Sequence, residues 1–259
     1  MQTVIFHDTI FGPIHSRRLG TSLGVNLLPN DGKVCSFDCL YCEAGFNAQG
    51  AGTTGFPSRK KVRKDLENKL SEMKSKGETL DVITFSGNGE PTLHPEFAGI
   101  IDDTIELRDN YFPDVKISVL TNSTHLDSQE VSAALRKVDN NIVKLDSAID
   151  TTMRALDRPN SPSFTVGKVI PLLAQFAGQS IVQTMFTFGT FEGREIDNTT
   201  DAEVDALIDA YRLIKPAQIM IYSIDRKTPA ENLHKVPREK LENIATRIRT
   251  ATGIAVSVA

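Results

Sequence analysis

The chain has 259 residues, 40% of them hydrophobic, and a formal net charge of −4 at pH 7. This length and apolar content suit a single domain with one sizeable core, and the slight negative charge excludes a general attraction to nucleic acid while leaving room for a local basic patch. No stretch approaches the roughly eighteen apolar residues of a membrane span, and the N-terminal MQTVIFHDTI lacks the basic start and apolar centre of a signal peptide. We therefore expect a cytoplasmic protein without membrane contact.

Short β-branched runs alternate with amphipathic segments along the chain. One amphipathic segment ends at Gly77, a typical residue after a helix, and another opens with the capping box Thr200-x-x-Glu203. The expected strands are 21–28, 80–87, 115–122, 141–148, 180–188 and 218–225, and the expected helices are 63–77, 95–109, 128–138, 164–177, 199–216 and 238–251. Six repeats of strand then helix predict parallel strands with right-handed crossovers, in a barrel or an open doubly wound sheet.

Five of these strands end in polar side chains, and the positions of those side chains favour the barrel. The residues are Ser86, Thr121, Asn122, Lys144, Asp146, Gln183, Thr184, Tyr222 and Ser223. Some would serve only as strand-end caps. In a barrel, however, the C-terminal strand ends meet at one mouth, where barrel enzymes hold their active sites. The sequence thus predicts an α/β fold with a partial (β/α)6 TIM-like barrel.

Two basic stretches and one glycine-rich segment interrupt the alternation. Arg17 and Arg18 precede the first expected strand, where a substrate phosphate, a substrate carboxylate or an acidic surface residue would partner them. RKKVRK at 59–64 places five positive charges at the start of an expected helix, and we interpret it as a solvated linker, with phosphate binding as the alternative. The aperiodic segment 46–61 is interpreted as a mobile lid or as the docking site of a reductase.

The chain has three cysteines, Cys35, Cys39 and Cys42, all within CSFDCLYC. Three thiols cannot form a disulfide framework, so the group indicates a metal or redox site. Structural zinc would need a fourth Cys or His, and none of the five histidines follows at a zinc-like spacing. A thioredoxin-like pair would leave Cys35 without a role. An iron–sulfur cluster held by three thiolates would leave one iron open.

The C-x-x-x-C-x-x-C spacing, with the aromatic Tyr41 before the third cysteine, resembles the signature of the radical SAM superfamily. The resemblance implies that Cys35, Cys39 and Cys42 hold a [4Fe–4S] cluster whose open iron is chelated by S-adenosylmethionine (SAM). Reduction of the cluster would cleave SAM to a 5′-deoxyadenosyl radical, which abstracts hydrogen from a substrate. The protein would then supply binding, orientation and exclusion of side reactions.

A second motif, FSGNGEPTLHPEF at 85–97, resembles the Gly-Gly-Glu motif of the same superfamily, with Asn88 where a glycine is frequent. Glycine at a strand end lets the backbone approach a ligand, and a carboxylate balances a cation. Asn88, Gly89 and Glu90 are therefore expected to line the SAM site, with Gly89 and Glu90 at the methionine ammonium, although a plain βα loop would have a similar composition.

The resemblance also implies contacts between SAM and the later strand ends. The expected residues are Asn122, Lys144 and Asp146 at the methionine carboxylate and ribose, Gln183 and Tyr222 at adenine or substrate, and Tyr41 as a shield of the cluster. Lys144 and Asp146 lie two apart on one strand face, so they would alternatively form a buried ion pair with each other.

The segments 11–29, 144–160 and 222–245 resemble a bacterial and archaeal group of short radical SAM proteins related to the wyosine-base enzymes that modify tRNA. Archaeal wyosine enzymes carry extra cysteines for a second cluster that handles pyruvate, and this chain has none, so pyruvate condensation is not expected.

We expect a single radical SAM domain over 1–259, with a lead-in at 1–20, a barrel core at 21–226 and a C-terminal helix and tail at 227–259 that cap the open end. The expected partners are SAM, an electron donor such as flavodoxin or ferredoxin, and tRNA or an anionic metabolite as substrate. The alternative is an iron–sulfur or zinc protein that binds nucleic acid or acts as a scaffold without cleaving SAM.

Overall fold

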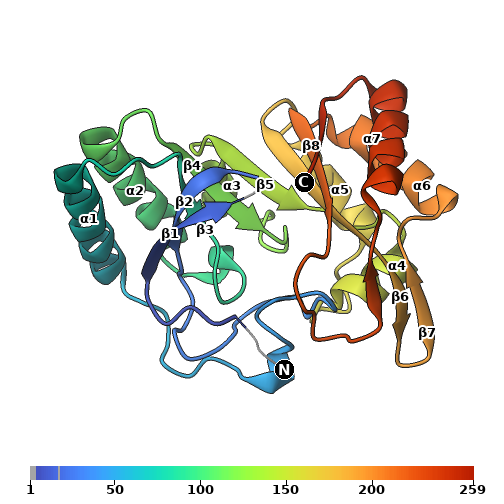
Figure 1. The fold of residues 1–259 in the computed structure, drawn as a ribbon, viewed down its shortest axis with the longest axis horizontal. Coiled ribbons are helices and arrows are strands. Elements are labelled where there is room, and N and C mark those ends of the chain that lie inside the picture. Colours follow the sequence, from blue (N-terminus) through green and yellow to red (C-terminus); the bar gives the residue numbers. More distant parts are fainter. Residues whose placement is uncertain (1–3, 17) are drawn as a thin grey trace.

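The computed structural model describes residues 4–16 and 18–259 and contains one mixed sheet with the strand order β1-β2-β3-β4-β5-β6-β8-β10 (Figure 1). Neighbouring strands from β2 to β10 in this order are parallel, and β1 pairs antiparallel with β2 at one edge. Within the described residues β1 and β10 do not pair with each other, so the barrel stays open.

The six expected strands are present close to their expected bounds. They are β2 (Gly20–Val25), β3 (Val82–Phe85), β4 (Lys116–Thr121), β5 (Asn140–Lys144), β6 (Ser180–Phe191) and β8 (Gln218–Ser223). Four further strands were not predicted: β1 (Ile10–Ser16), β7 (Arg194–Asp197), β9 (Leu233–Lys235) and β10 (Val256–Val258). β1 and β10 lie at sheet edges with no fully buried side chains, which explains their weak sequence signal. β7 and β9 pair with the extension of β6 beyond the barrel.

The expected helices are also present, as α1 (Arg59–Lys76), α2 (Phe97–Tyr111), α3 (Gln129–Leu135), α5 (Val166–Ala174), α6 (Asp201–Ile214) and α7 (Arg238–Thr252). Helix α4 (Asp150–Asp157) and the short 3-10 turns η1 (Asn47–Gln49) and η2 (Pro91–Leu93) were not predicted. The C-terminal helix α7 contacts α6, β8 and β10, so it belongs to the outer helix layer (Figure 1). Its role as a cap of the open end stays a prediction. None of the helices in the described part of the chain has the length and apolar character that a bilayer crossing requires.

The expectation of a solvated linker at 59–64 is wrong, because this stretch forms the first turns of α1. Arg59 donates to the Asp103 carboxylate of α2 through Nε at 2.7 Å and Nη2 at 2.8 Å. Arg63 Nη1 reaches the same carboxylate at 3.1 Å. These ion pairs join α1 to α2, so the positive charge has a structural role.

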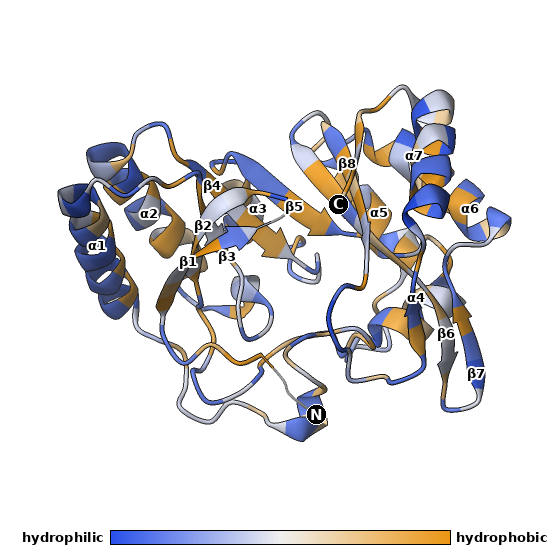
Figure 2. Ribbon diagram, viewed as in Figure 1, coloured by the Kyte–Doolittle hydropathy of each residue, from blue (hydrophilic) through white to orange (hydrophobic). Residues whose placement is uncertain are grey.

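Apolar residues gather on the strands and on the helix faces that cover them, whereas the outer face of α1 is hydrophilic (Figure 2). A smaller apolar cluster lies on the opposite face of the sheet, inside the barrel, because its strand residues alternate with those of the main core. Its members are Ile142, Ile181 and Met220, with Leu19 and Leu120 packed against them. Leu19 belongs to the turn between β1 and β2, so this turn reaches into the lumen.

Candidate active site

The three cysteines lie on one loop after β2, residues 33–45, called the cluster loop below. Cys35, Cys39 and Cys42 are half-buried free thiols. The Cys42 amide donates to the Cys39 carbonyl at 3.1 Å, and the Gly45 amide donates to the Cys42 carbonyl at 2.9 Å, so two tight turns shape the loop from Cys39 to Gly45. Burial raises the pKa of Cys35 to about 12 and holds the pKa of Cys39 well above its usual value. Conversion to thiolates therefore needs nearby positive charge, which a metal centre supplies.

These thiols suit a cluster better than a single metal ion. A zinc ion would hold its sulfur ligands about 2.3 Å away. Among the described residues, no three His, Cys, Asp or Glu side chains lie close enough together to hold one such ion. An iron–sulfur cluster distributes its thiolates over several irons, and three free cysteines on one loop provide that donor set. The residues present therefore fit a cluster with three protein ligands.

The first part of the cluster loop is anchored on the turn that follows β3. The Val34 amide donates to the Asn88 carbonyl at 2.9 Å, and the Glu90 amide donates to the Val34 carbonyl at 3.2 Å. Gly89 lies between these bonds with a φ of +140°, and a Cβ there would be 1.8 Å from the Val34 carbonyl oxygen. Glycine is thus needed at this position for the approach of the cluster loop itself.

The Asn88 side chain is fully buried and points into the protein. Its Oδ1 accepts the Phe6 amide at 2.9 Å, and its Nδ2 donates to the carbonyls of Phe6 and Pro29, both at 2.8 Å. Asn88 therefore ties the turn after β3 to the N-terminal lead-in. A glycine here would lose these three bonds, which accounts for the departure from the superfamily pattern.

The Glu90 carboxylate is also buried and is satisfied by the protein. Its Oε1 accepts the hydroxyls of Thr92 at 2.6 Å and Thr121 at 2.7 Å, and its Oε2 accepts the Asn122 amide at 2.7 Å. Burial raises the pKa of Glu90, although these hydrogen bonds oppose the shift. The carboxylate thus joins the turn to the end of β4, and its contact with a methionine ammonium stays a prediction.

The central part of the cluster loop is held by α4. The Asp38 amide donates to the Asp157 carbonyl at 3.1 Å, and the Leu40 amide donates to the Leu156 carbonyl at 3.0 Å. Helix α4 was not predicted from the sequence because it has only eight residues and no side-chain N-cap. The available signal was the spacing of Met153 and Leu156, three apart and both buried.

Four polar side chains meet beneath the cluster loop at the mouth of the barrel, and we call them the mouth group: Tyr41, Lys144, Asp146 and Asp157. Lys144 Nζ donates to the Tyr41 hydroxyl and to the Asp146 carboxylate, and the Tyr41 hydroxyl donates to the same carboxylate. Lys144 Nζ also lies 2.8 Å from Asp157 Oδ1. The ion pair between Lys144 and Asp146, one of two alternatives from the sequence, is present, and Asp157 is a second carboxylate that the sequence did not reveal.

The mouth group places one positive charge beside two acidic side chains. Burial disfavours the Lys144 ammonium, yet Asp146 and Asp157 hold its pKa well above the ordinary value. Burial raises the pKa of Asp157 to about 8, although Lys144 opposes the shift. Burial and the charge of Asp146 raise the pKa of Tyr41, so its hydroxyl is a neutral donor. The group can therefore accept hydrogen bonds from hydroxyls and donate one to a carboxylate.

Asn122 and Gln183 lie at different depths of the barrel. Asn122 Nδ2 donates to the Ser36 hydroxyl at 2.9 Å and lies 3.6 Å from Cys35 Sγ, so it touches the cluster loop. Gln183 Nε2 faces Met220 Sδ at 3.5 Å, beside the apolar cluster of the lumen. The structure therefore brings Asn122, but not Gln183, to the cysteines.

Tyr222 lies at the rim of the barrel beneath a cation. The Arg18 guanidinium carbon is 4.6 Å from the centre of the Tyr222 ring. Arg18 Nη1 is buried and has no hydrogen-bond partner in the described part of the chain. Tyr41 and Tyr222 line the same small cavity as Arg18, which links this cation to the mouth group. Arg17 lies outside the described residues.

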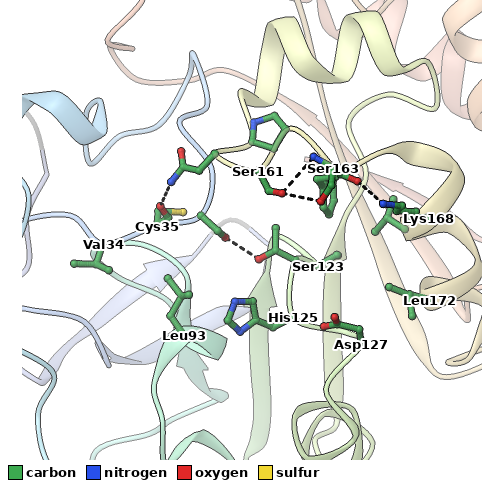
Figure 3. Close-up of a pocket in the computed structure, with 16 residues that line it drawn as sticks. Val34, Cys35, Leu93, Ser123, His125, Asp127, Ser161, Ser163, Lys168 and Leu172 are labelled. Atoms are coloured by element: carbon green, nitrogen blue, oxygen red, sulfur yellow. Dashed lines mark hydrogen bonds between the residues drawn. The ribbon is translucent and has the colours of Figure 1, made fainter.

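A larger cavity of about 630 Å³ lies beside Cys35 (Figure 3). Ser123, His125 and Asp127, from the segment after β4, face Ser161 and Ser163 from the loop before α5. Of the site residues predicted from sequence, Cys35 alone lines this cavity. A ligand there would touch the cluster loop but not the mouth group.

The family model of the radical SAM superfamily matches residues 30–173 of this chain. The matched region is more than half of the chain and contains the cluster loop, the turn after β3, the mouth group and α4.

Similar curated proteins come from bacteria and archaea. A UPF0026 protein of Methanocaldococcus jannaschii is 31% identical over 180 residues, which cover 68% of this chain and 53% of the relative. A Brachyspira hyodysenteriae protein named GTPase Obg is 26% identical over 250 residues, 96% of this chain and 35% of that protein. The chain thus spans about a third and about half of these two relatives. It contains no G-x-x-x-x-G-K-S/T phosphate loop, so the GTPase name says nothing of its chemistry.

Solved structures share the fold at low identity. A radical SAM methyltransferase from Sphaerobacter thermophilus has a TM-score of 0.68 at 17% identity and covers 92% of this chain and 65% of its own. TYW1, solved with a lysine–pyruvate adduct, has a TM-score of 0.60 at 11% identity, with coverages of 90% and 75%. These likenesses confirm the predicted α/β partial barrel. The family match over the cluster loop and the mouth group shows that the chain belongs to the radical SAM superfamily.

Proposed function

We propose that this chain is a radical SAM enzyme that holds a [4Fe–4S] cluster with Cys35, Cys39 and Cys42 and acts on an anionic substrate. The observation that carries the proposal is the position of the three free thiols, on a loop that lies between the turn after β3 and the mouth group. When bound, such a cluster supplies the electron that cleaves SAM to a 5′-deoxyadenosyl radical, and that radical abstracts hydrogen from the substrate.

The mouth group would bind and orient SAM. Lys144 can donate to the methionine carboxylate, and Asp146 can accept hydrogen bonds from ribose hydroxyls, in exchange for their present bonds with Tyr41. The Tyr41 ring lies 4.6 Å from the Lys144 ammonium and shields this end of the loop from water. Asn122 would complete the site beside Cys35. The apolar cluster around Leu19 would exclude water from the lumen, where a radical would otherwise be quenched.

Arg18 supports an anionic substrate. Its Nη1 is buried and has no hydrogen-bond partner among the described residues, which is costly without a ligand. Arg18 lines a small cavity with Tyr41 and Tyr222, and Arg226, Glu43 and Asp225 also line it. A phosphate or carboxylate would satisfy the Arg18 donor. We therefore propose a nucleoside in tRNA or a small anionic metabolite as substrate. We further propose a flavodoxin or ferredoxin as the electron donor of the cluster, and a cytoplasmic location.

Anaerobic reconstitution tests the proposal. The protein is loaded with iron and sulfide, reduced, and mixed with SAM, and 5′-deoxyadenosine is measured by mass spectrometry beside a Cys39→Ala control. We expect 5′-deoxyadenosine only from the intact chain. A stable cluster without SAM cleavage, even with tRNA and metabolite fractions added, would support the rival binding or scaffold role. One zinc per chain without sulfide would support the zinc protein instead.

Deuterium transfer tests the substrate class. Deuterated tRNA, deuterated small anionic metabolites and deuterated neutral metabolites are offered separately, and deuterium is sought in 5′-deoxyadenosine. We expect transfer from one fraction, and an Arg18→Gln variant that loses transfer while still cleaving SAM without substrate. Transfer from a neutral fraction alone would contradict the anionic assignment.

A further inference from the structure

Lys33 is a buried lysine that directly precedes the thiol-bearing part of the cluster loop. The residue is 2% exposed. Its Nζ donates to the Gly45 carbonyl at 2.9 Å, and the one carboxylate within ion-pair distance in the described residues is Asp38, at 3.5 Å. Lysine is almost never fully buried without a close partner, because an ammonium removed from water is costly. The charge of Lys33 therefore calls for further compensation.

Asp38 compensates Lys33 only in part. Asp38 Oδ1 also accepts the Asn47 amide at 2.7 Å, and Asp38 Oδ2 lies 3.7 Å from Arg158 Nη1. The carboxylate is thus shared between two cations and keeps some contact with water, because its side chain is 15% exposed. The fully buried ammonium retains an excess of positive charge.

The cluster loop closes around this ammonium. The loop begins at Lys33, and its far end returns so that the Gly45 carbonyl accepts from Nζ while the Gly45 amide bonds the Cys42 carbonyl. All three thiols lie on the segment between these two contacts.

We propose that Lys33 is a built-in countercharge that stabilises the reduced cluster and raises its reduction potential. The inference rests on the proposed function. The reduced cluster carries one more negative charge than the oxidised one, and a fixed positive charge in a water-poor loop lowers its energy. The electron comes from a one-electron donor protein and passes on to SAM, and Lys33 gives up neither a proton nor an electron. Lys33 touches no substrate, so it is a positioning residue that acts through the cluster.

The test is an anaerobic redox titration of the loaded protein, followed by electron paramagnetic resonance of the reduced cluster. Lys33→Met is compared with the wild type and with Lys64→Met, which removes the same charge from an exposed position on α1. At the wild-type midpoint, we expect the ratio of reduced to oxidised cluster to fall about tenfold in Lys33→Met, a shift of about 59 mV for one electron. Lys64→Met should change it less than twofold. Equal midpoints in the two variants would overturn the proposal.

If Lys33→Met retains no iron and sulfide, Asp38→Asn tests whether the charge balance of the cluster loop sets the reduction potential. This variant removes a negative charge from the same loop and keeps an oxygen for the Asn47 amide, so the ratio of reduced to oxidised cluster should rise. An unchanged ratio would limit Lys33 to a structural role and overturn the proposal. If the wild type itself holds no iron and sulfide, the proposed function is refuted. If the wild type cleaves SAM but Lys33→Met and Asp38→Asn have the wild-type midpoint, only the role of Lys33 is refuted.

Discussion

Replacing Gly89 by alanine should detach the cluster loop from the turn after β3. The new Cβ would lie 1.8 Å from the Val34 carbonyl oxygen, and a φ of +140° is strained for any side chain. Relief requires movement of Val34, which breaks its two backbone hydrogen bonds with Asn88 and Glu90. At about 1 kcal/mol for each hydrogen bond and about 1–3 kcal/mol for the strain, the free energy of unfolding should fall by about 3–5 kcal/mol.

Urea unfolding of the metal-free protein, followed by circular dichroism, measures this loss. The matched control is Gly167→Ala in α5, where no atom lies within 4 Å of the added Cβ. A helix gains about 0.5–1 kcal/mol from that change. Iron and sulfide are then measured after reconstitution, and Gly89→Ala should hold less of both. If the two variants unfold at the same urea concentration and load equally, the close approach of Val34 does not depend on glycine and our account of the motif is wrong.

Three further predictions concern the mouth group, the large cavity and the helix layer. Asp146→Asn should weaken SAM binding at least tenfold in equilibrium dialysis, whereas Ser163→Trp, which fills the cavity beside Cys35, should leave it unchanged; the reverse result would move the SAM site to that cavity. Asp157 has a pKa raised to about 8 by burial, so the native protein keeps a proton that the unfolded chain releases above about pH 4. Wild-type stability to urea should therefore fall between pH 5 and pH 8, and Asp157→Asn should show a shallower fall; equal slopes would contradict the assignment. Asp103→Asn should lower the free energy of unfolding by about 1–2 kcal/mol, since it breaks the ion pairs of Arg59 and Arg63, and should leave SAM cleavage intact.

Most of the barrel could be predicted because its strands and helices carry strong periodic signals. The parallel strands are buried on both faces by helices and lumen, so they appear as β-branched runs in the sequence. The start of α6 is predicted by its N-cap Thr200, whose side chain accepts the backbone amide of Glu203. The edge strands β1 and β10 and the short helix α4 bury too little surface to leave such a pattern. The role of residues 59–64 could not be predicted either, because the partner of Arg59, Asp103, lies on α2, far along the chain.

The cysteine spacing predicted the family through its resemblance to the radical SAM signature, and the family match confirms it. Without that resemblance, three thiols within eight residues and no fourth thiol in the chain indicate only a metal or redox site. Lys33, the one Lys or Arg of the cluster loop, and Gly89 can be read from the sequence, but their roles cannot. Burial and close backbone approach depend on what packs against them, and those partners are remote along the chain.

Only the tertiary structure decided how the site is assembled. Tyr41 meets Asp146 across 105 positions of sequence, and Asn88 reaches Phe6 across 82. The fold tied the Asn88 side chain to Phe6 and Pro29 and the Glu90 carboxylate to Asn122. It also added Asp157 to Lys144 and buried Lys33 against the Gly45 end of the cluster loop. The physical reason is that the cost of a buried charge, and of an unpaired donor, depends on the groups brought within a few ångströms by folding, whereas a sequence pattern records only which residue types are neighbours along the chain.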